Sequence, residues 1–252
     1  MKTRTADLHL HTLLSPCGSL EMSPDHIISR AVTLGLDTIG ITDHNTTRQC
    51  EVVRDMGKQK GIEVLMGAEV TTREEVHCLV YFENSTTLRR FQQYLDDHLP
   101  EFQNDPGRFG YQVAVDERNN IIYEEGRLLI NALDVSLEQM CSVVHSLEGI
   151  IIPAHIDRPR FGLIGQLGFI PAGLEVDGFE ISVFTEPSRL SARNHTVADY
   201  ALIRGSDAHQ PVMIGSSFSS FLCEKLDFCT FKSMLRQRRN FIYLPESDLF
   251  IN

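Results

Sequence analysis

The 252-residue sequence predicts an α/β protein built around a largely parallel sheet. Short apolar runs of strand-like composition alternate with stretches of helical periodicity that end at glycine, a pattern typical of β–α–β units. Histidine and carboxylate side chains fall repeatedly at the ends of the strand-like runs, where α/β proteins place their functional groups. A hydrophobic content of 42% is ordinary for a folded core, so we expect a globular chain.

The first third of the chain contains four expected strands and two expected helices. Ser23 and Pro24 are typical of a helix start, because serine caps the first amides and proline fits the first turn. Gly35 and Gly61 are typical of helix ends. The expected elements are a strand at 2–6, a helix at 24–34, a strand at 37–42, a helix from 46 or 47 to 60, and strands at 63–70 and 76–82.

The region at about 83–149 interrupts this alternation. We interpret it as an inserted subdomain or lid within a single domain that spans residues 1–252, and we expect it to shape specificity. It contains an expected helix at 87–99, a polar stretch at 104–120, short strand-like pieces and an expected helix at 136–147. The alternation then resumes with strands at 149–154, 178–182 and 201–206, a strand-like run at 214–222, a helix at 230–238 and a last run at 241–244.

Charge and cysteine usage restrict the expected partners and location. Lys and Arg total 23 and Asp and Glu total 34, which gives a net charge of −11. Such a surface repels polyanions, so we expect little binding to duplex nucleic acid and none to membranes, while metal charge can still attract a small phosphorylated substrate. The N-terminus has no signal-like apolar segment, and the six cysteines form no CxxC pair. We therefore expect reduced thiols and a cytoplasmic location.

Two histidines begin the candidate site. His9 and His11 follow the first strand, and residues two apart in a strand project to the same side, so one metal ion could bind both. Further candidates lie at or near the ends of later strands: Asp43, His44, Glu69, His77, His155, Asp207 and His209. Imidazole and carboxylate together favour Zn, Mn or Fe. These candidates are more than one ion can bind. We therefore expect two or three divalent ions, with Glu69 able to bridge two of them.

Some of these side chains have alternative interpretations. A carboxylate at a strand end can cap a helix, and Asp43 in particular can support a ligand without binding metal. Glu180, at the end of the sixth strand, can contact substrate or orient a ligand. The histidines at 26, 98, 145 and 195 lie in expected helices or polar surroundings, and we interpret them as ordinary surface or core residues.

The motifs that carry the candidate ligands resemble those of the PHP (polymerase and histidinol phosphatase) superfamily. They are Asp-Leu-His-Leu-His-Thr from Asp7, Ile-Thr-Asp-His-Asn from Ile41, Gly-Ala-Glu ending at Glu69, the strand that carries His77, Pro-Ala-His ending at His155 and Gly-Ser-Asp-Ala-His ending at His209. The resemblance implies a distorted, TIM-like (β/α)7 barrel that holds two or three metal ions and hydrolyses phosphoesters. It implies one metal site of His9, His11, Glu69 and Asp207, a second of Glu69, His77 and His155, and a third of His44 and His209 with a ligand from the loop after the first motif.

Cys17 departs from the family pattern. The family usually has His or Asp six residues after the second histidine of the first motif, and here that residue is Cys17. One interpretation makes Cys17 a thiolate ligand of the third ion, which would favour Zn or Fe over Mn or Mg. The other leaves the third site weak or empty and Cys17 an ordinary loop thiol. We favour ligation, because Pro16 and Gly18 constrain the loop around it.

The predicted chemistry is hydrolysis of a small phosphomonoester or nucleotide by attack of a metal-bound hydroxide. Glu69 and Asp207 are the predicted catalytic carboxylates. Arg158 is the predicted phosphate contact, because a guanidinium binds two phosphate oxygens at once. Arg160 and Arg193 are weaker candidates, more simply explained as surface residues.

The sequence also allows two alternative functions. An amidohydrolase-like enzyme would also use paired histidines on a first strand, but such enzymes usually carry a barrel lysine, and no lysine occurs between Lys60 and Lys225. A non-catalytic metal-binding module is the second alternative. The sequence leaves the oligomeric state open.

Overall fold

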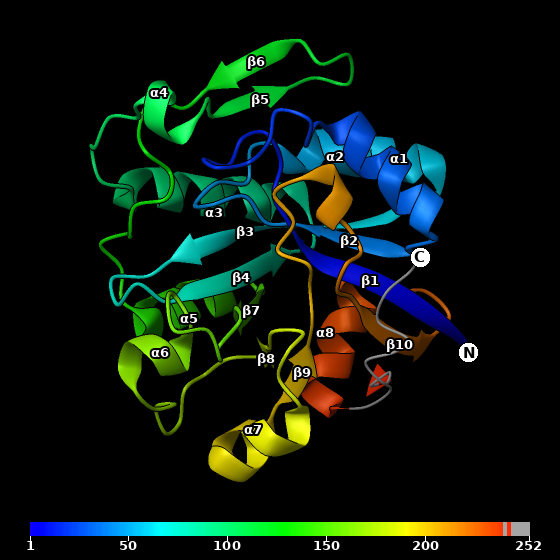
Figure 1. Cartoon of the computed structure of the whole chain (residues 1–252), viewed down its shortest axis with the longest axis vertical. Helices are drawn as coiled ribbons and strands as arrows, with labels where there is room; N and C mark the ends of the chain where they lie inside the picture. The colour runs from blue at the N-terminus through cyan, green and yellow to red at the C-terminus, as the bar shows by residue number, and fades with distance from the viewer. Residues whose placement is uncertain (239–240, 243–252) are drawn as a thin grey trace.

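A curled sheet of seven strands forms the centre of the computed structural model, which describes residues 1–238 and 241–242 (Figure 1). In order across the sheet the strands are β11 (Phe241–Ile242), β10 (Ser219–Cys223), β1 (Lys2–Leu10), β2 (Thr38–Ile41), β3 (Glu63–Thr71), β4 (His77–Phe82) and β7 (Ile150–Pro153). β1, β2 and β3 are parallel, with Ala6 opposite Thr38 and Thr38 opposite Glu63. This is the parallel core that the alternation of strands and helices predicts.

The expectation of a parallel sheet is wrong for the fourth strand. β4 is antiparallel to both β3 and β7. Only residues 72–76 connect β3 to β4, and a parallel crossover needs roughly a dozen residues or more, so this connection permits only an antiparallel neighbour. β10 is also antiparallel to β1. Part of the run expected at 241–244 forms β11, and the rest of that run lies outside the described residues.

Two further strands approach the sheet at one end. β8 (Gly178–Glu180) and β9 (Ala201–Ile203) form a separate parallel pair. The amide of Ile156, just after β7, donates to the carbonyl of Glu180 at 2.9 Å, and the amide of His11 donates to the carbonyl of Ala208 at 3.0 Å. The carboxyl ends of β7, β8, β9 and β1 therefore lie next to one another. The α/β class is confirmed with a curled, mixed sheet, while a regular (β/α)7 barrel stays a prediction.

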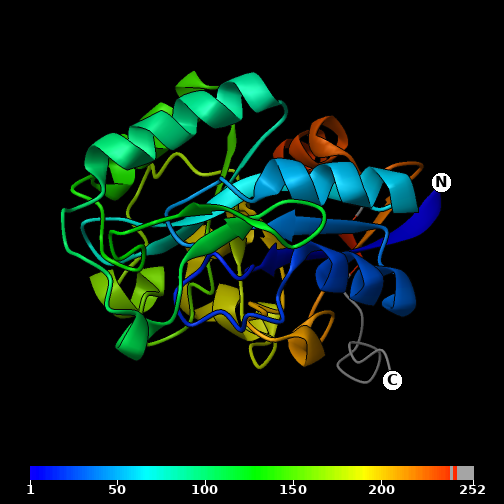
Figure 2. The ribbon, with the colours of Figure 1, turned by 90° about the horizontal axis from the view of Figure 1, so that it is seen from above.

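Helices cover both faces of the sheet. Four helices lie over one face: α1 (Pro24–Leu34), α2 (Cys50–Lys60), α3 (Ser85–His98) and α5 (Leu137–Ser146). Figure 2 shows α1 and α2 side by side. On the other face α8 (Phe228–Gln237) packs against β1, β3, β4 and β7, with Phe231 in edge contact with Tyr81. The sheet thus lies between two apolar layers, and its carboxyl edge is left for polar side chains.

The predicted helix ends match the structure closely. Gly35 and Gly61 follow α1 and α2 in the left-handed backbone conformation, with φ of 68° and 77°, which glycine adopts without strain. α2 begins at Cys50, later than the sequence predicts. The amide and the hydroxyl of Thr47 both donate to the side-chain oxygen of Gln92, at 2.6 and 2.9 Å, and this holds the preceding residues in a loop.

The region at 83–149 has two kinds of structure. α3 and α5 pack on the sheet with the main core, through residues such as Phe91 and Val144. Between them lie α4 (Pro106–Phe109) and the hairpin of β5 (Val113–Val115) and β6 (Ile121–Glu124), which stand beyond the sheet in Figure 1. Val113 and Val115 pack on Leu13, in the loop after β1. The boundaries of the predicted insertion stay a prediction.

The remaining helices of the described chain are short. They are α6 (Leu163–Leu167), α7 (Pro187–Arg193) and a 3₁₀ turn at His195–Asp199 that leads into β9, and a second 3₁₀ turn at Pro211–Met213 follows β9. Within the described residues, none of the helices has the length and apolar character needed to span a membrane.

Candidate metal centre

The predicted metal ligands gather at the carboxyl edge of the parallel strands. His9 lies at the end of β1, His44 follows β2 by three residues, and Glu69 lies near the end of β3. His77 lies at the start of its strand, which is unexpected for a parallel sheet. Because β4 is antiparallel, its start lies opposite Thr71 at the end of β3, and His77 therefore joins the other ligands.

Four side chains form the first group that the sequence predicts as a metal site. His9, His11, Glu69 and Asp207 each present a ligand atom, and these atoms all lie within 4.8 Å of one another. Nε2 of His9 lies 3.2 Å from Nε2 of His11 and 3.3 Å from a Glu69 oxygen. A single Asp207 oxygen lies 3.4 Å from His9 and 3.2 Å from His11. This convergence of nitrogen and oxygen donors suits a divalent transition ion.

Glu69 lies at the centre of the whole cluster. Its Oε1 atom lies 2.8 Å from Nδ1 of His77 and 3.2 Å from Nε2 of His155, which are its partners in the predicted second site. Its Oε2 atom lies 3.1 Å from Nδ1 of His44. His44, Glu69 and His77 also form a potential metal-binding group. The two oxygens of one buried carboxylate therefore face different histidines, as a bridging ligand requires.

The third group consists of His44, His209 and His11. The rings of His11 and His209 stack with centroids 4.0 Å apart. Cys17 lies on the wall of the same pocket, and its thiol is free and exposed. Partial burial and the nearby Asp207 and Glu69 carboxylates raise the pKa of Cys17 to about 11. The structure thus brings Cys17 near His209 without placing it in the group, and its ligation stays a prediction.

Unpaired polar atoms show that the residues fit a metal cofactor. Nε2 of His77 and Nδ1 of His155 are buried and have no hydrogen-bond partner within the described structure. Buried polar atoms are costly when unpaired, and a bound cation would satisfy them.

The electrostatics of the site agree with cation binding. Burial opposes a charge on His11, yet Asp207 and Glu69 raise its pKa to about 9. Burial and His11 lower the pKa of His209 to about 4, which leaves that ring in the neutral form that metals bind. The pocket attracts positive charge, which divalent ions would supply in place of protons.

A second layer of residues holds the histidines, and the sequence identifies it only in part. The carboxylate of Glu180 lies 3.0 Å from Nδ1 of His9, so Glu180 orients a candidate ligand, one of its two expected roles. Nδ1 of His11 lies 2.9 Å from the Ser15 hydroxyl, which donates to Asp43 at 2.8 Å. Asp43 thus supports a candidate ligand through Ser15, as one of its interpretations predicts. Ser15 was missed, and its signal is a hydroxyl four residues after His11.

Asp7 is a further supporting residue that sequence reasoning did not assign. It is fully buried, and its two oxygens accept from the amides of Ser206 and Gly215 at 2.9 and 2.8 Å. These bonds tie the segment before Asp207 to the end of β1. Asp7 has the same two-residue spacing from His9 that His9 has from His11.

The cluster opens into a pocket of about 510 Å³, here called the metal pocket. Arg158 lines it, and a guanidinium nitrogen of Arg158 donates to Asp207 Oδ2 at 2.5 Å. Arg160 also lines the pocket, whereas Arg193 lines a different cavity. Phe161 stacks on His77 with ring centroids 4.4 Å apart. The guanidinium of Arg158 and the ring of Phe161 thus border the candidate ligands on the open side of the pocket.

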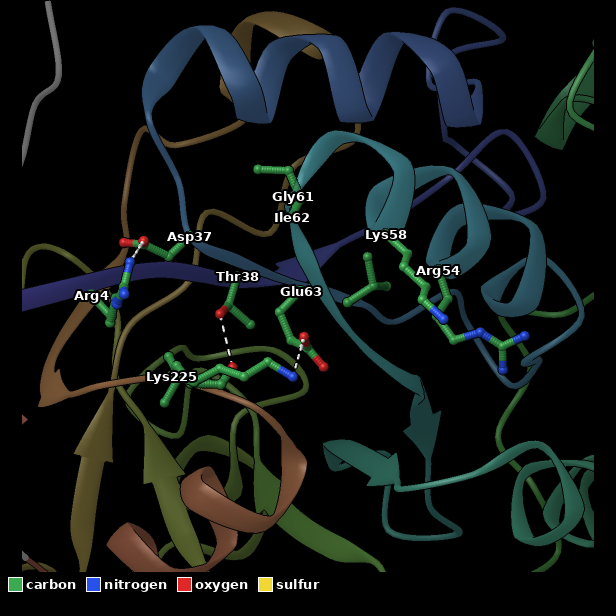
Figure 3. Close-up of a pocket in the computed structure, with 11 residues that line it drawn as sticks. Arg4, Asp37, Thr38, Arg54, Lys58, Gly61, Ile62, Glu63 and Lys225 are labelled. Atoms are coloured by element: carbon green, nitrogen blue, oxygen red, sulfur yellow. Dashed lines mark hydrogen bonds and ion pairs between the residues drawn. The ribbon is translucent and has the colours of Figure 1, made fainter.

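Another cavity, of about 580 Å³, lies at the opposite end of the strands (Figure 3). Four basic residues line it: Arg4, Arg54, Lys58 and Lys225. Arg4 pairs with Asp37 at 2.6 Å and Lys225 with Glu63 at 3.0 Å, and Figure 3 shows both pairs. This cavity lies at the amino ends of β2 and β3, whereas ligands of α/β sheets bind at the carboxyl ends.

The sequence profile of the PHP domain family matches residues 7–158, which include most of the clustered ligands. The chain belongs to the PHP domain family. Members of this family are metal-dependent hydrolases, and PHP domains bind metal ions. The predicted resemblance is confirmed. The number and identity of the ions, and the assignment of each ligand, stay predictions.

Two curated relatives match parts of this PHP chain. An uncharacterized protein of Methanocaldococcus jannaschii is 37% identical over 78 residues, which are 27% of this chain and 45% of the relative. A 5′-3′ exoribonuclease of Haemophilus influenzae is 33% identical over 73 residues, which are 29% of this chain and 26% of the relative. The matched segments thus span less than half of either relative.

Solved structures share the PHP fold over most of the chain. The lesion-specific endonuclease Q of Pyrococcus furiosus superposes with a TM-score of 0.73 at 18% identity, covering 95% of this chain and 57% of the endonuclease. A candidate metal-dependent phosphoesterase from Bifidobacterium adolescentis superposes with a TM-score of 0.57 at 18% identity, covering 82% of this chain and 88% of that protein. The fold is therefore that of PHP proteins.

One of these comparisons corrects the expectation about duplex nucleic acid. Endonuclease Q in complex with a 27-mer duplex substrate that has an abasic lesion at the active site superposes with a TM-score of 0.68 at 17% identity, covering 95% of this chain and 58% of that protein. The prediction of little binding to duplex nucleic acid is therefore wrong, because a protein of the same fold binds a duplex. Net charge is a sum over the whole surface, whereas binding depends on the local field at the site.

Proposed function

We propose that this PHP protein is a metal-dependent phosphoesterase that hydrolyses a small phosphomonoester or a nucleotide. The observation that carries the proposal is Glu69, whose two oxygens face separate histidine groups at 2.8 to 3.2 Å beside a pocket bordered by Arg158. Two or three divalent ions, of the Zn, Mn or Fe type, fit the three ligand groups.

The residues suited to hold the ions are those of the three sites that the sequence predicts. His9, His11, Glu69 and Asp207 would hold one ion, Glu69 with His77 and His155 a second, and His44 with His209 a third, completed by Cys17 or His11. When bound, such ions supply Lewis acidity toward the phosphoryl oxygens and lower the pKa of water toward neutrality.

Arg158 and its neighbours perform the remaining steps. The guanidinium of Arg158 is held toward the ligands by Asp207, so it can bind non-bridging oxygens of a phosphate and stabilise charge as it develops. Phe161 and Ile130 line the same pocket and exclude water from the ester. Glu180 keeps His9 in one orientation, and the Ser15–Asp43 pair does the same for His11.

The relatives support a phosphate ester as substrate. An exoribonuclease and a lesion-specific endonuclease both cleave nucleic-acid phosphoesters, and a pocket of about 510 Å³ suits a group of the size of one nucleotide. An amidohydrolase-like activity has less support, because residues 61–224 contain no lysine to bridge two metals.

Metal content and a substrate screen test the proposal. Protein purified without chelator is expected to contain two or more ions per chain. With Mn or Zn added, it is expected to hydrolyse at least one of a set of sugar phosphates, nucleotides, oligonucleotides and histidinol phosphate. His9→Ala should abolish that activity with the fold intact, and Arg158→Lys should lower kcat/KM by about tenfold or more through loss of the guanidinium fork.

The matched control is His26→Ala, because His26 is exposed on α1 and bonds only the carbonyl of Glu21 in the described structure. This variant should keep metal and activity. A folded wild-type protein that binds no metal would exclude the phosphoesterase. Metal binding without hydrolysis of any ester would favour the non-catalytic module.

A further inference from the structure

A second cavity adjoins the metal pocket, and the mechanism above does not use it. This cavity, here called the side pocket, has a volume of about 600 Å³. The loops that follow β7, β8 and β9 form it, together with residues 213–217. It shares His155, Arg158, Pro159 and Asp207 with the metal pocket. A ligand bound at the metal ligands can therefore extend past Arg158 into the side pocket.

The composition of the side pocket indicates what it can bind. Among the described residues, Arg158 is the only Lys or Arg that lines it, and its position at the shared wall assigns it to the phosphate. The three carboxylates are already engaged: Asp157 accepts from the hydroxyls of Ser182 and Thr185, Glu180 faces His9, and Asp207 accepts from Arg158. The side pocket thus offers no cation for a second phosphate and suits an uncharged group.

Two side chains of the side pocket are available to a ligand. Ser217 is 4% exposed, and its hydroxyl oxygen is buried without a hydrogen-bond partner in the described structure. Such a group gains a bond from a polar ligand at little cost. Phe184 is 91% exposed, the highest value among the large hydrophobic residues of the described chain. An exposed aromatic ring beside a cavity offers a flat surface for a planar ring to stack on.

We propose that the side pocket binds the uncharged leaving group of the substrate, and that this group is a nucleoside whose base stacks on Phe184 and whose polar edge bonds Ser217. This inference rests on the proposed phosphoesterase function and narrows its substrate to nucleotides. In the reaction the bond between phosphorus and the ester oxygen breaks, water supplies the new oxygen on phosphorus, and a proton from that water ends on the nucleoside hydroxyl.

Nucleoside binding tests the proposal without relying on turnover. Isothermal titration of the purified protein with adenosine is expected to show binding that Phe184→Ala weakens about tenfold, the usual size of a lost base–aromatic stack. Ser217→Ala should also weaken it. Phe169→Ala is the matched control, because Phe169 is 61% exposed and lines neither pocket. Adenosine binding that is absent, or equal in wild type and both variants, would overturn the proposal.

Kinetics separate this inference from the function on which it rests. Phe184→Ala is expected to lower kcat/KM for adenosine monophosphate about tenfold and to leave that for glycerol phosphate unchanged, since glycerol is too small to reach Phe184. Equal losses for the two esters would contradict a nucleoside subsite while leaving the phosphoesterase intact. If wild type hydrolyses neither ester nor any other phosphate, the proposed function fails, and the titration alone decides whether the side pocket binds nucleosides.

Discussion

The carboxylate of Glu180 lies 3.0 Å from Nδ1 of His9, and both side chains are almost completely buried. A carboxylate accepts hydrogen bonds, so Nδ1 of His9 carries the hydrogen and Nε2 is left to face Glu69 and Asp207. Glu180 also accepts from the amide of His155 at 3.0 Å. One carboxylate therefore holds the segments that carry His9 and His155. The loop that follows Glu180 lines the side pocket.

Glu180→Ala is predicted to weaken metal binding. Loss of a carboxylate behind a ligating histidine typically costs about 10- to 100-fold in metal affinity, because the ring loses its orientation and basicity. Titration of stripped protein with Zn, followed by a competing chelator, measures the change. Glu175→Ala is the control, since Glu175 is exposed three residues before β8. Equal affinities for the Glu180 and Glu175 variants would show that Glu180 is dispensable for the site.

The sequence predicts which side chains cluster better than it predicts how they are grouped. Period-two spacing in a strand makes His9 and His11 a pair, and strand-end positions select His44, His155 and Asp207. The closeness of His11 to His209 depends on the bridge between Leu10 and Ala208, which no local pattern encodes. The supporting roles of Ser15 and Asp7 likewise depend on contacts distant in the sequence.

The fold shows the same division between local and distant information. Helix ends at Gly35 and Gly61 are local and were predicted correctly, because glycine adopts the positive φ that a helix end needs. The direction of β4 was readable from the short connection at 72–76, and the expectation of a parallel sheet overlooked it. Curvature of the sheet depends on packing across the whole chain.

Cys17→Ser is predicted to lower by one the number of protons that each chain releases when it binds metal ions. Partial burial and the nearby carboxylates give Cys17 a pKa of about 11, so the thiol is neutral at pH 8 and must lose a proton to bind a metal. If Cys17 is a ligand, wild type should release about one proton more per chain than the variant and bind one ion more tightly. A pH-stat with metal analysis measures both. Identical numbers of released protons and bound ions in wild type and Cys17→Ser would make Cys17 an ordinary loop thiol. Cys229→Ser is the control, because Cys229 is another exposed free thiol.

Glu125→Gln is predicted to reduce stability at pH 7 and to lose this effect in acid. Burial opposes ionisation, yet the hydroxyl of Tyr123 and the guanidinium of Arg127 hold the pKa of Glu125 below its usual 4.5. A depressed pKa in the folded state stabilises the fold above the unfolded value, and this contribution fades as the pH falls below about 4.5. We expect a difference of about 1 kcal/mol at pH 7 that shrinks toward pH 3.5.

Urea unfolding of wild type and Glu125→Gln at several pH values measures this difference. Glu117→Gln provides the comparison, because Glu117 is an exposed glutamate in the turn between β5 and β6, and β6 leads directly into Glu125. A gap between wild type and Glu125→Gln that widens as the pH falls would contradict the assigned sign.

Gly205→Ala is predicted to disturb the metal centre although Gly205 binds nothing. A Cβ atom at this position would lie 2.6 Å from Cβ of His9 and 2.7 Å from an oxygen of Glu180, closer than real contacts allow. Either His9 or Glu180 must move, and overpacking of this kind costs about 1–3 kcal/mol. The metal content and the urea concentration at the midpoint of unfolding should both fall. Gly126→Ala is the matched control, because the nearest atom to its added Cβ is a Gln103 oxygen at 3.7 Å. Full metal content in Gly205→Ala would mean that the bond between His9 and Glu180 does not set the geometry of the site.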